Sequence, residues 1–190
     1  MQYSIAIIPP RYIVRKAEKM KRDLCGEIDP YPSVHSEAHF TISTFSVHEA
    51  EHDLWLKKLE RFCAEASSFK VHLNSIETFP SSGCIYIAPD DLSRRRIKRF
   101  MADFHRETSC LKAIRTHEPH MTIGRGLTEI QLIRAKNYFI GLPIDLPFEC
   151  NQLCIRKLDL TRRQYEVEYA YPFEGKGAAR GDARQLGFWD

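Results

Sequence analysis

Two stretches of the chain repeat a His-x-Thr pattern with similar flanks. Residues 37–43 read EAHFTIS, and residues 118–124 read EPHMTIG. Near neutral pH a neutral imidazole can take a proton and an imidazolium can give one, so two histidines can serve one reaction as base and acid. Two threonine hydroxyls beside them can donate hydrogen bonds to the oxygens of a phosphate. The pattern therefore indicates a phosphodiester site, provided that the two stretches meet.

Strand alternation explains how each stretch would present its polar side chains. Residues two apart on a strand face the same side, so His39 lies with Thr41, and His120 lies with Thr122. The opposite faces are apolar, with Phe40 and Ile42 in the first stretch and Met121 and Ile123 in the second. We expect all four polar residues to be catalytic, with the two threonines also binding substrate. This chemistry requires no metal, and we expect neither a metal nor a cofactor.

The elements around the repeat occur in the same order twice. Hydrophobic periodicity predicts strands over 3–10, 39–45, 69–79, 83–89 and 120–124, helices over 12–25, 49–66, 92–108 and 128–140, and a final strand pair over 153–173 turned near 161–164. A unit of about 80 residues used twice favours two related lobes, about 1–80 and 81–173, within one domain spanning 1–173. Residues 174–190, rich in Gly, Ala and Arg, are expected to form a mobile tail.

Length and composition restrict the class of protein. A chain of 190 residues with 43% hydrophobic content can bury a sizeable core. No apolar run approaches the roughly 20 residues of a membrane span, and the six scattered cysteines contain no C-x-x-C pair, as expected of reduced thiols. We expect a cytoplasmic monomer without membrane contact. The net charge of +3 permits an anionic partner without requiring one.

The stretches HFTI and HMTI, in a chain of this length and element order, resemble the 2H phosphoesterase superfamily, which includes 2'-5' RNA ligase and RNA 2',3'-cyclic phosphodiesterase proteins. The resemblance covers about residues 1–173, including the first strand closed by Pro9 and Pro10 and the final hairpin bearing Tyr165. It implies an α+β fold with two pseudo-symmetric lobes, antiparallel sheets around a central cleft and helices outside. It also implies a phosphodiesterase that opens 2',3'-cyclic phosphates of RNA ends or nucleotides to 2'-phosphates.

Within that resemblance, the substrate and the direction of the reaction stay open. The alternatives are 2'-5' RNA ligase activity, hydrolysis of 2'-5' linkages, and action on nucleotide-sugar cyclic phosphates. The two motifs are chemically equivalent, so the sequence does not assign which histidine is the acid and which the base.

A different class is suggested by HEAEH at 48–52, which matches the zinc-peptidase pattern with His48 and His52 as ligands and Glu49 as base. The acidic neighbours Glu51 and Asp53 and the lack of a marked third ligand favour a solvated helix face instead.

A second alternative is a non-catalytic RNA-binding module built on RRRIKR at 94–99. Ile97 interrupts this run at helical spacing, which is typical of a solvated helix face. If the run does follow RNA, replacing Arg94, Arg95 and Arg96 should flatten the salt dependence of RNA binding without changing turnover of a mononucleotide. No phosphate-binding glycine loop is present, so the sequence gives no support for ATP or NAD dependence.

Overall fold

The computed structural model of the chain describes residues 1–176, with the side chains of residues 49 and 50 left undescribed. The tail expected over 174–190 therefore lies outside the described residues, apart from its first three positions. None of the helices in the described range is long and apolar enough to cross a membrane.

The helices lie close to their predicted ranges. They are α1 (Arg11–Ile28), α2 (Glu49–Glu65), α3 (Asp91–Glu107) and α4 (Glu129–Phe139), with a short 3-10 turn at Pro80–Ser82. Thr128 opens α4 as expected, because its hydroxyl accepts from the Gln131 amide while the Gln131 side chain accepts from the Thr128 amide. Asp90 caps α3 by accepting from the Ser93 amide at 2.7 Å.

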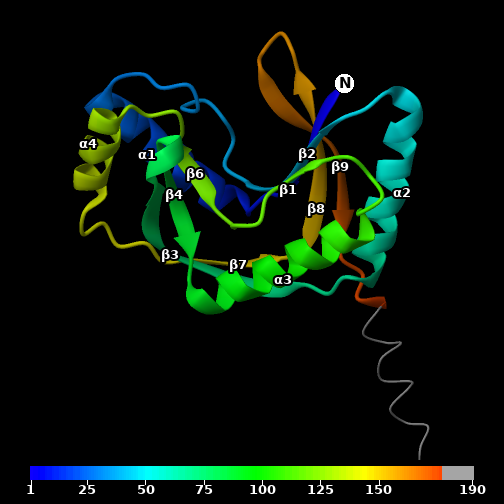
Figure 1. Cartoon of the computed structure of the whole chain (residues 1–190). Coiled ribbons are helices and arrows are strands. Elements are labelled where there is room, and N and C mark those ends of the chain that lie inside the picture. Colours follow the sequence, from blue (N-terminus) through cyan, green and yellow to red (C-terminus); the bar gives the residue numbers. More distant parts are fainter. Residues whose placement is uncertain (177–190) are drawn as a thin grey trace, which may run out of the picture.

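The strands of the described chain form one curled antiparallel sheet (Figure 1). They are β1 (Gln2–Ile7), β2 (Phe40–Ser46), β3 (Phe69–Phe79), β4 (Cys84–Pro89), β5 (Ile114–Arg115), β6 (Met121–Gly124), β7 (Leu146–Cys150), β8 (Gln152–Asp159) and β9 (Gln164–Pro172). The order across the sheet is β7-β3-β4-β6-β2-β1-β8-β9, and β5 adds to β2. The α+β class with antiparallel strands is thus confirmed.

This strand order has an internal symmetry centred between β6 and β2. The β6 half consists of β6, β4, β3 and β7, and the β2 half consists of β2, β1, β8 and β9. Each half begins at a His-x-Thr strand and proceeds through equivalent neighbours. The division differs from the sequence lobes of about 1–80 and 81–173, because β3 lies with β4 while β8 and β9 return to β1. The two halves of the sheet are therefore related by symmetry, but each half contains strands from both the first and the second part of the chain.

The helices also cross between the halves. α1 follows β1 but packs against α4 and β6, while α3 follows β4 and reaches α2, where Phe100 and Phe104 meet Phe62 edge-on with ring centroids 5.2 Å apart. One hydrophobic core runs through both halves. Helices that follow strands of one half thus pack on elements of the other half.

Two strands were missed by periodicity. β7 shows period-two burial but contains Pro147, which weakens a strand signal, and it is an edge strand, where proline is tolerated. β5 has only two residues, Ile114 and Arg115, too few to show any period.

Candidate active site

The two His-x-Thr strands meet at a single residue pair. Phe40 of β2 lies opposite Met121 of β6 in antiparallel register, and both side chains are fully buried. The local two-fold axis through this pair exchanges His39 with His120, and Thr41 with Thr122. All four of these side chains are half-buried on the face opposite the two apolar residues. Diagonal neighbours on antiparallel strands lie roughly 7–8 Å apart, so the two histidines can flank one phosphate.

Each motif strand carries a β-bulge immediately after its threonine. Pairing with β1 shifts so that Ile42 is the extra residue, and pairing with β4 shifts so that Ile123 is the extra residue. A bulge bends its strand and re-aims the adjacent side chains, and such bulges are common beside active sites. The two halves therefore share a local distortion as well as the sequence motif, and the distortion falls at equivalent positions.

Both imidazoles are oriented by the main chain in the same way. Nδ1 of His39 lies 2.7 Å from the carbonyl oxygen of Glu37, and Nδ1 of His120 lies 2.8 Å from the carbonyl oxygen of Glu118. A carbonyl only accepts, so Nδ1 carries the hydrogen in each ring. Nε2 then holds a lone pair in the neutral ring and a proton in the charged ring. Either histidine can therefore accept or donate a proton through Nε2.

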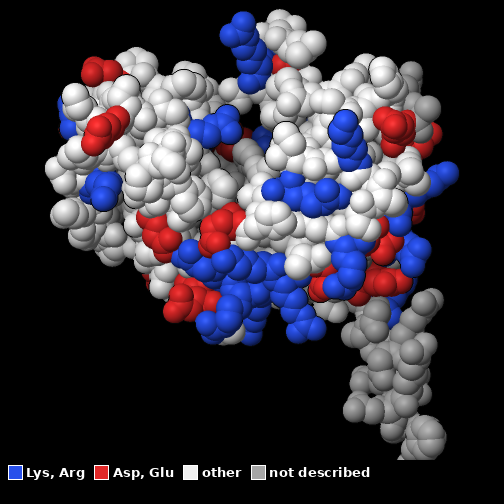
Figure 2. All heavy atoms as spheres, in the orientation of Figure 1, with Lys and Arg blue, Asp and Glu red and all other residues white. Residues whose placement is uncertain are grey.

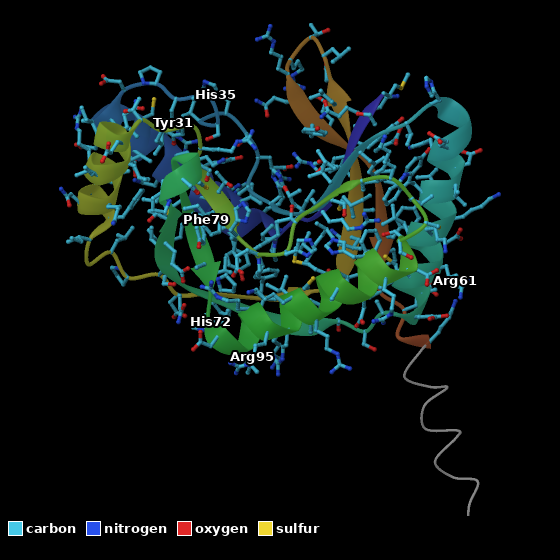
Figure 3. The ribbon with its side chains drawn as sticks, in the orientation of Figure 1. Tyr31, His35, Arg61, His72, Phe79 and Arg95 are labelled. Atoms are coloured by element: carbon cyan, nitrogen blue, oxygen red, sulfur yellow. The ribbon has the colours of Figure 1, made fainter. Side chains whose placement is uncertain are left out.

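Aromatic rings surround His120. Its ring meets Phe79 edge-on with centroids 5.2 Å apart and Tyr86 at 5.5 Å. Figure 3 labels Phe79 in the half that contains β6. The Tyr86 hydroxyl donates to Glu77 at 3.0 Å, and burial followed by that hydrogen bond raises the pKa of Tyr86.

A buried cation takes the corresponding place beside His39. Along the sheet, Cys84 lies opposite Phe79 in the β6 half, and the equivalent Ser4 lies opposite Arg156 in the β2 half. The Arg156 side chain is 2% exposed, donates to the Tyr165 carbonyl at 3.0 Å and lies 3.8 Å from the Glu37 carboxylate. Its Nε and Nη1 atoms are buried without a hydrogen-bond partner. Burial, then the charge of Arg156, lowers the pKa of His39 to about 3.

The connector before His39 is held by a buried lysine on α1. Lys21 Nζ donates to the Ser36 carbonyl at 2.7 Å and to the Ser36 hydroxyl at 2.9 Å, and burial lowers the pKa of Lys21 to about 8. The same connector touches the end of β6, because the Ser33 hydroxyl accepts from the Arg125 amide at 2.9 Å and the Tyr31 hydroxyl donates to the Ile123 carbonyl at 3.3 Å. The segment leading into one motif is therefore anchored to the other.

The basic run on α3 is partly engaged at the site. Arg94 donates to Glu118 at 2.9 Å and also pairs with Glu77, and Lys98 lies 2.5 Å from Glu118. Figure 2 shows Lys and Arg side chains gathered over α3 beside acidic groups. Arg94 therefore contacts Glu118, the residue whose carbonyl accepts from His120, so we no longer expect its replacement to leave turnover of a mononucleotide unchanged. Arg95 is exposed and points away from α3 (Figure 3).

We predict that Arg94→Ala lowers turnover several-fold because Glu118 loses the guanidinium that fixes its position, and the His120 ring then loses orientation. Removing one partner from a hydrogen-bonded network of this kind typically costs about 1–3 kcal/mol. Arg95→Ala, one residue along the same helix, is the matched control and should turn over normally. Steady-state rates and melting curves of both variants test this, and equal rates would show that Arg94 has no part in orienting His120.

The remaining histidines lie outside the motif pair. His52 of HEAEH is hydrogen-bonded to Glu168 at 2.9 Å and stacked on Tyr3, while His48 is exposed at the start of α2. Within the part of the chain that the structure describes, no three His, Cys, Asp or Glu side chains are placed to share a metal ion. His105 is buried, and its Nε2 lies 3.1 Å from the Ile42 carbonyl oxygen.

Sequence reasoning missed Arg156, Lys21 and the orienting role of the two glutamate carbonyls. The flanking glutamates were visible as part of the repeat, but their carboxylates were the obvious candidates, and the main-chain contact cannot be read from residue type. Arg156 and Lys21 are charged residues in ordinary strand and helix patterns, and such residues are almost always exposed. Only the tertiary structure shows that both are buried beside His39.

Comparison with known protein families identifies the family of this chain. A family model described as the 2'-5' RNA ligase superfamily matches residues 9–162, and the chain belongs to this superfamily of 2H phosphoesterases. The expected resemblance is thus confirmed. Comparison with curated protein sequences finds no match.

Solved structures of low sequence identity share the fold. Escherichia coli LigT complexed with 3'-AMP is similar with a TM-score of 0.67 and 12% identity, covering 90% of this chain and 97% of LigT. TT0787 of Thermus thermophilus gives 0.62 and 13%, covering 93% and 100%. Usb1 of Kluyveromyces marxianus gives 0.50 and 13%, covering 90% and 97%. Membership of the superfamily supports a phosphoesterase or ligase type of activity on RNA or nucleotide substrates.

Proposed function

We propose that the protein is a phosphodiesterase that opens 2',3'-cyclic phosphates of RNA ends or nucleotides to 2'-phosphates. The observation that carries this proposal is the equivalent placement of His39 and His120, each fixed through Nδ1 and each beside a threonine on one face of an antiparallel pair. Such an arrangement presents two Nε2 atoms to one phosphate from opposite sides, as an in-line displacement needs.

The reaction balances with one water. Nε2 of one histidine takes a proton from the attacking water, whose oxygen forms a bond to phosphorus. The bond between phosphorus and O3' breaks, and the departing oxygen receives the proton from Nε2 of the other histidine. The products are a 2'-phosphate and a 3'-hydroxyl, and proton exchange with solvent resets the pair. The Thr41 and Thr122 hydroxyls donate to the non-bridging oxygens as negative charge grows on them.

The ligands of the related structures fit this proposal. LigT has been solved with 3'-AMP, phosphate, ATP and NADP+, so that protein accommodates nucleotides and phosphate. In this chain the aromatic pair Phe79 and Tyr86 beside His120 offers rings on which a nucleobase can stack. The cationic residues beside His39 favour the phosphate side of a nucleotide.

We expect Thr41→Ala and Thr122→Ala to be milder than loss of either histidine. Each removes one hydrogen bond to a charged oxygen, worth upward of about 1.5 kcal/mol, so the rate should fall by roughly tenfold or somewhat more. Thr44→Ala, on the same strand but beyond the bulge, is the control. Single-turnover rates measured for the three variants check this, and a Thr44→Ala defect as large as the others would mean that the strand itself is perturbed.

The proposed function is tested by incubating the pure protein with 2',3'-cyclic nucleotides and with RNA ending in a cyclic phosphate, in EDTA and without ATP. Turnover is the expected result. Loss of turnover in EDTA that zinc restores would favour the HEAEH alternative. Binding of the RNA without any turnover would favour the non-catalytic module, and joining of RNA ends through a 2'-5' linkage would show that the same site runs in the ligase direction.

A further inference from the structure

The pseudo-symmetry of the site is broken in its charges. Both histidines have the same main-chain contact, but His120 is flanked by the rings of Phe79 and Tyr86, whereas Arg156 occupies the position beside His39 that is equivalent to Phe79. A proton on His39 would therefore add a second positive charge next to a buried guanidinium. The two rings beside His120 carry no positive charge.

The guanidinium is fixed where it stands. Arg156 lies on β8 with 2% of its side chain exposed, its Nη2 donates to the Tyr165 carbonyl at 3.0 Å, and its central carbon lies 5.7 Å from the centre of the Tyr165 ring. Its ion pair with Glu37 spans 3.8 Å, and the Glu37 carboxylate is 43% exposed and therefore screened by water. Because Nε and Nη1 are also buried without a partner, the charge is poorly compensated.

We propose that Arg156 is a positioning residue that keeps His39 unprotonated, so that His39 serves as the general base and His120 as the general acid. This inference rests on the proposed function, since it assigns the two roles within that reaction. Arg156 acts through His39, because its own unpaired donors are buried in the protein. Its Nη2 lies 3.8 Å from the carboxylate of Glu37, and the carbonyl of the same residue accepts from His39.

The other charged groups around His39 also lower its pKa. Lys21 on α1 and His120, which directly precedes β6, both lower the pKa of His39. Their effects are smaller than those of burial and of Arg156. The hydrogen bond with the carbonyl of Glu37, two residues earlier in the chain, raises the pKa of His39 but is outweighed. A neutral ring holds the Nε2 lone pair that a base needs, and it stays neutral at every pH above the lowered pKa. Activity should thus persist into acid until His39 takes a proton.

The direct test follows the histidine ring signals by NMR while the pH is changed, with His39 assigned from a His39→Asn variant. In the wild-type protein we expect His39 to remain neutral at pH 5.5, a pH at which free imidazole is mostly protonated. Arg156→Gln should raise the pKa of His39 by roughly one unit or more. Arg156→Lys retains the charge and should stay near the wild type, and Arg99→Gln, an exposed arginine on α3, is the control. An ordinary pKa for His39 in the wild type, or no change in Arg156→Gln, would overturn the inference, and the wild-type measurement stands even if Arg156→Gln fails to fold.

A kinetic test separates the two roles. The test substrate is a phosphodiester whose leaving group, 4-nitrophenolate, departs without protonation. On this ester the loss of rate in His120→Ala should be at least about tenfold smaller than its loss on a cyclic nucleotide, because no general acid is needed. The loss of rate in His39→Ala should be the same on both substrates. The opposite pattern would reverse the assignment. If the wild-type protein turned over neither substrate, the proposed function would fail while the NMR titration still decided the effect of Arg156. If it turned over both and the acid limb of kcat/KM did not move in Arg156→Gln, only the inference would fail.

Discussion

His39→Ala and His120→Ala should each lower kcat by at least about a hundredfold, because removal of a general acid or base typically costs 10² to 10⁴. The two imidazoles make equivalent hydrogen bonds to main-chain carbonyls and lie on a half-buried face, so their loss should leave the fold intact. The measurement is turnover of a 2',3'-cyclic nucleotide beside a melting curve for each variant.

The matched control for this pair is His35→Ala. His35 lies on the connector, four residues before His39, and its side chain is exposed (Figure 3). It should turn over as the wild type does. A double variant lacking both motif histidines that kept its activity would show that the repeated motif is structural and that catalysis lies elsewhere.

Gly83→Ala should destabilise the protein by at least about 3 kcal/mol, the range expected of a backbone clash in a region that is well packed. Gly83 has φ +57°, and an added Cβ would lie 2.1 Å from the Leu127 carbonyl oxygen, which is main chain and cannot swing away. The Leu127 amide also donates to the Gly83 carbonyl at 3.0 Å. The clash would therefore separate the turn at Gly83 from the segment around Leu127, which follows the second motif.

Gly141→Ala separates the two causes of that effect. Gly141 has φ +73° but no atom within 4 Å of an added Cβ, so it should cost only the left-handed strain, roughly 1–2 kcal/mol. Urea unfolding of both variants gives the comparison. Equal losses of unfolding free energy would mean that backbone strain alone, and not the contact with Leu127, makes glycine necessary at position 83.

The sequence predicted the parts of this protein that are local. Period-two alternation placed Phe40 and Met121 on the buried face, and the structure confirms both as fully buried. Thr128 caps the start of α4 near the predicted boundary, because a capping box depends only on nearby residues. What could not be predicted was the pairing: β8 returns to β1 from the far end of the chain, a contact that no local pattern records.

The candidate site divides in the same way. Its four motif residues were predicted from their spacing, but the asymmetry between them was not, since it comes from Arg156 on a strand distant in sequence. Arg94 was treated as one charge in a basic run, and only the structure shows that it differs from its neighbour Arg95 by its contacts with Glu118 and Glu77. Charged residues acquire such roles through burial and partners, and neither is visible in residue type.

The identity of the product tests the central claim most directly. The protein is incubated in EDTA with 2',3'-cyclic AMP in water enriched in ¹⁸O, and the product is followed by ³¹P NMR. The account predicts 2'-AMP alone, carrying one ¹⁸O on phosphorus, with no product from the variant lacking both His39 and His120. Release of 3'-AMP would contradict opening to a 2'-phosphate, and the same rate of product formation with the double variant would contradict the claim that these two histidines open the cyclic phosphate.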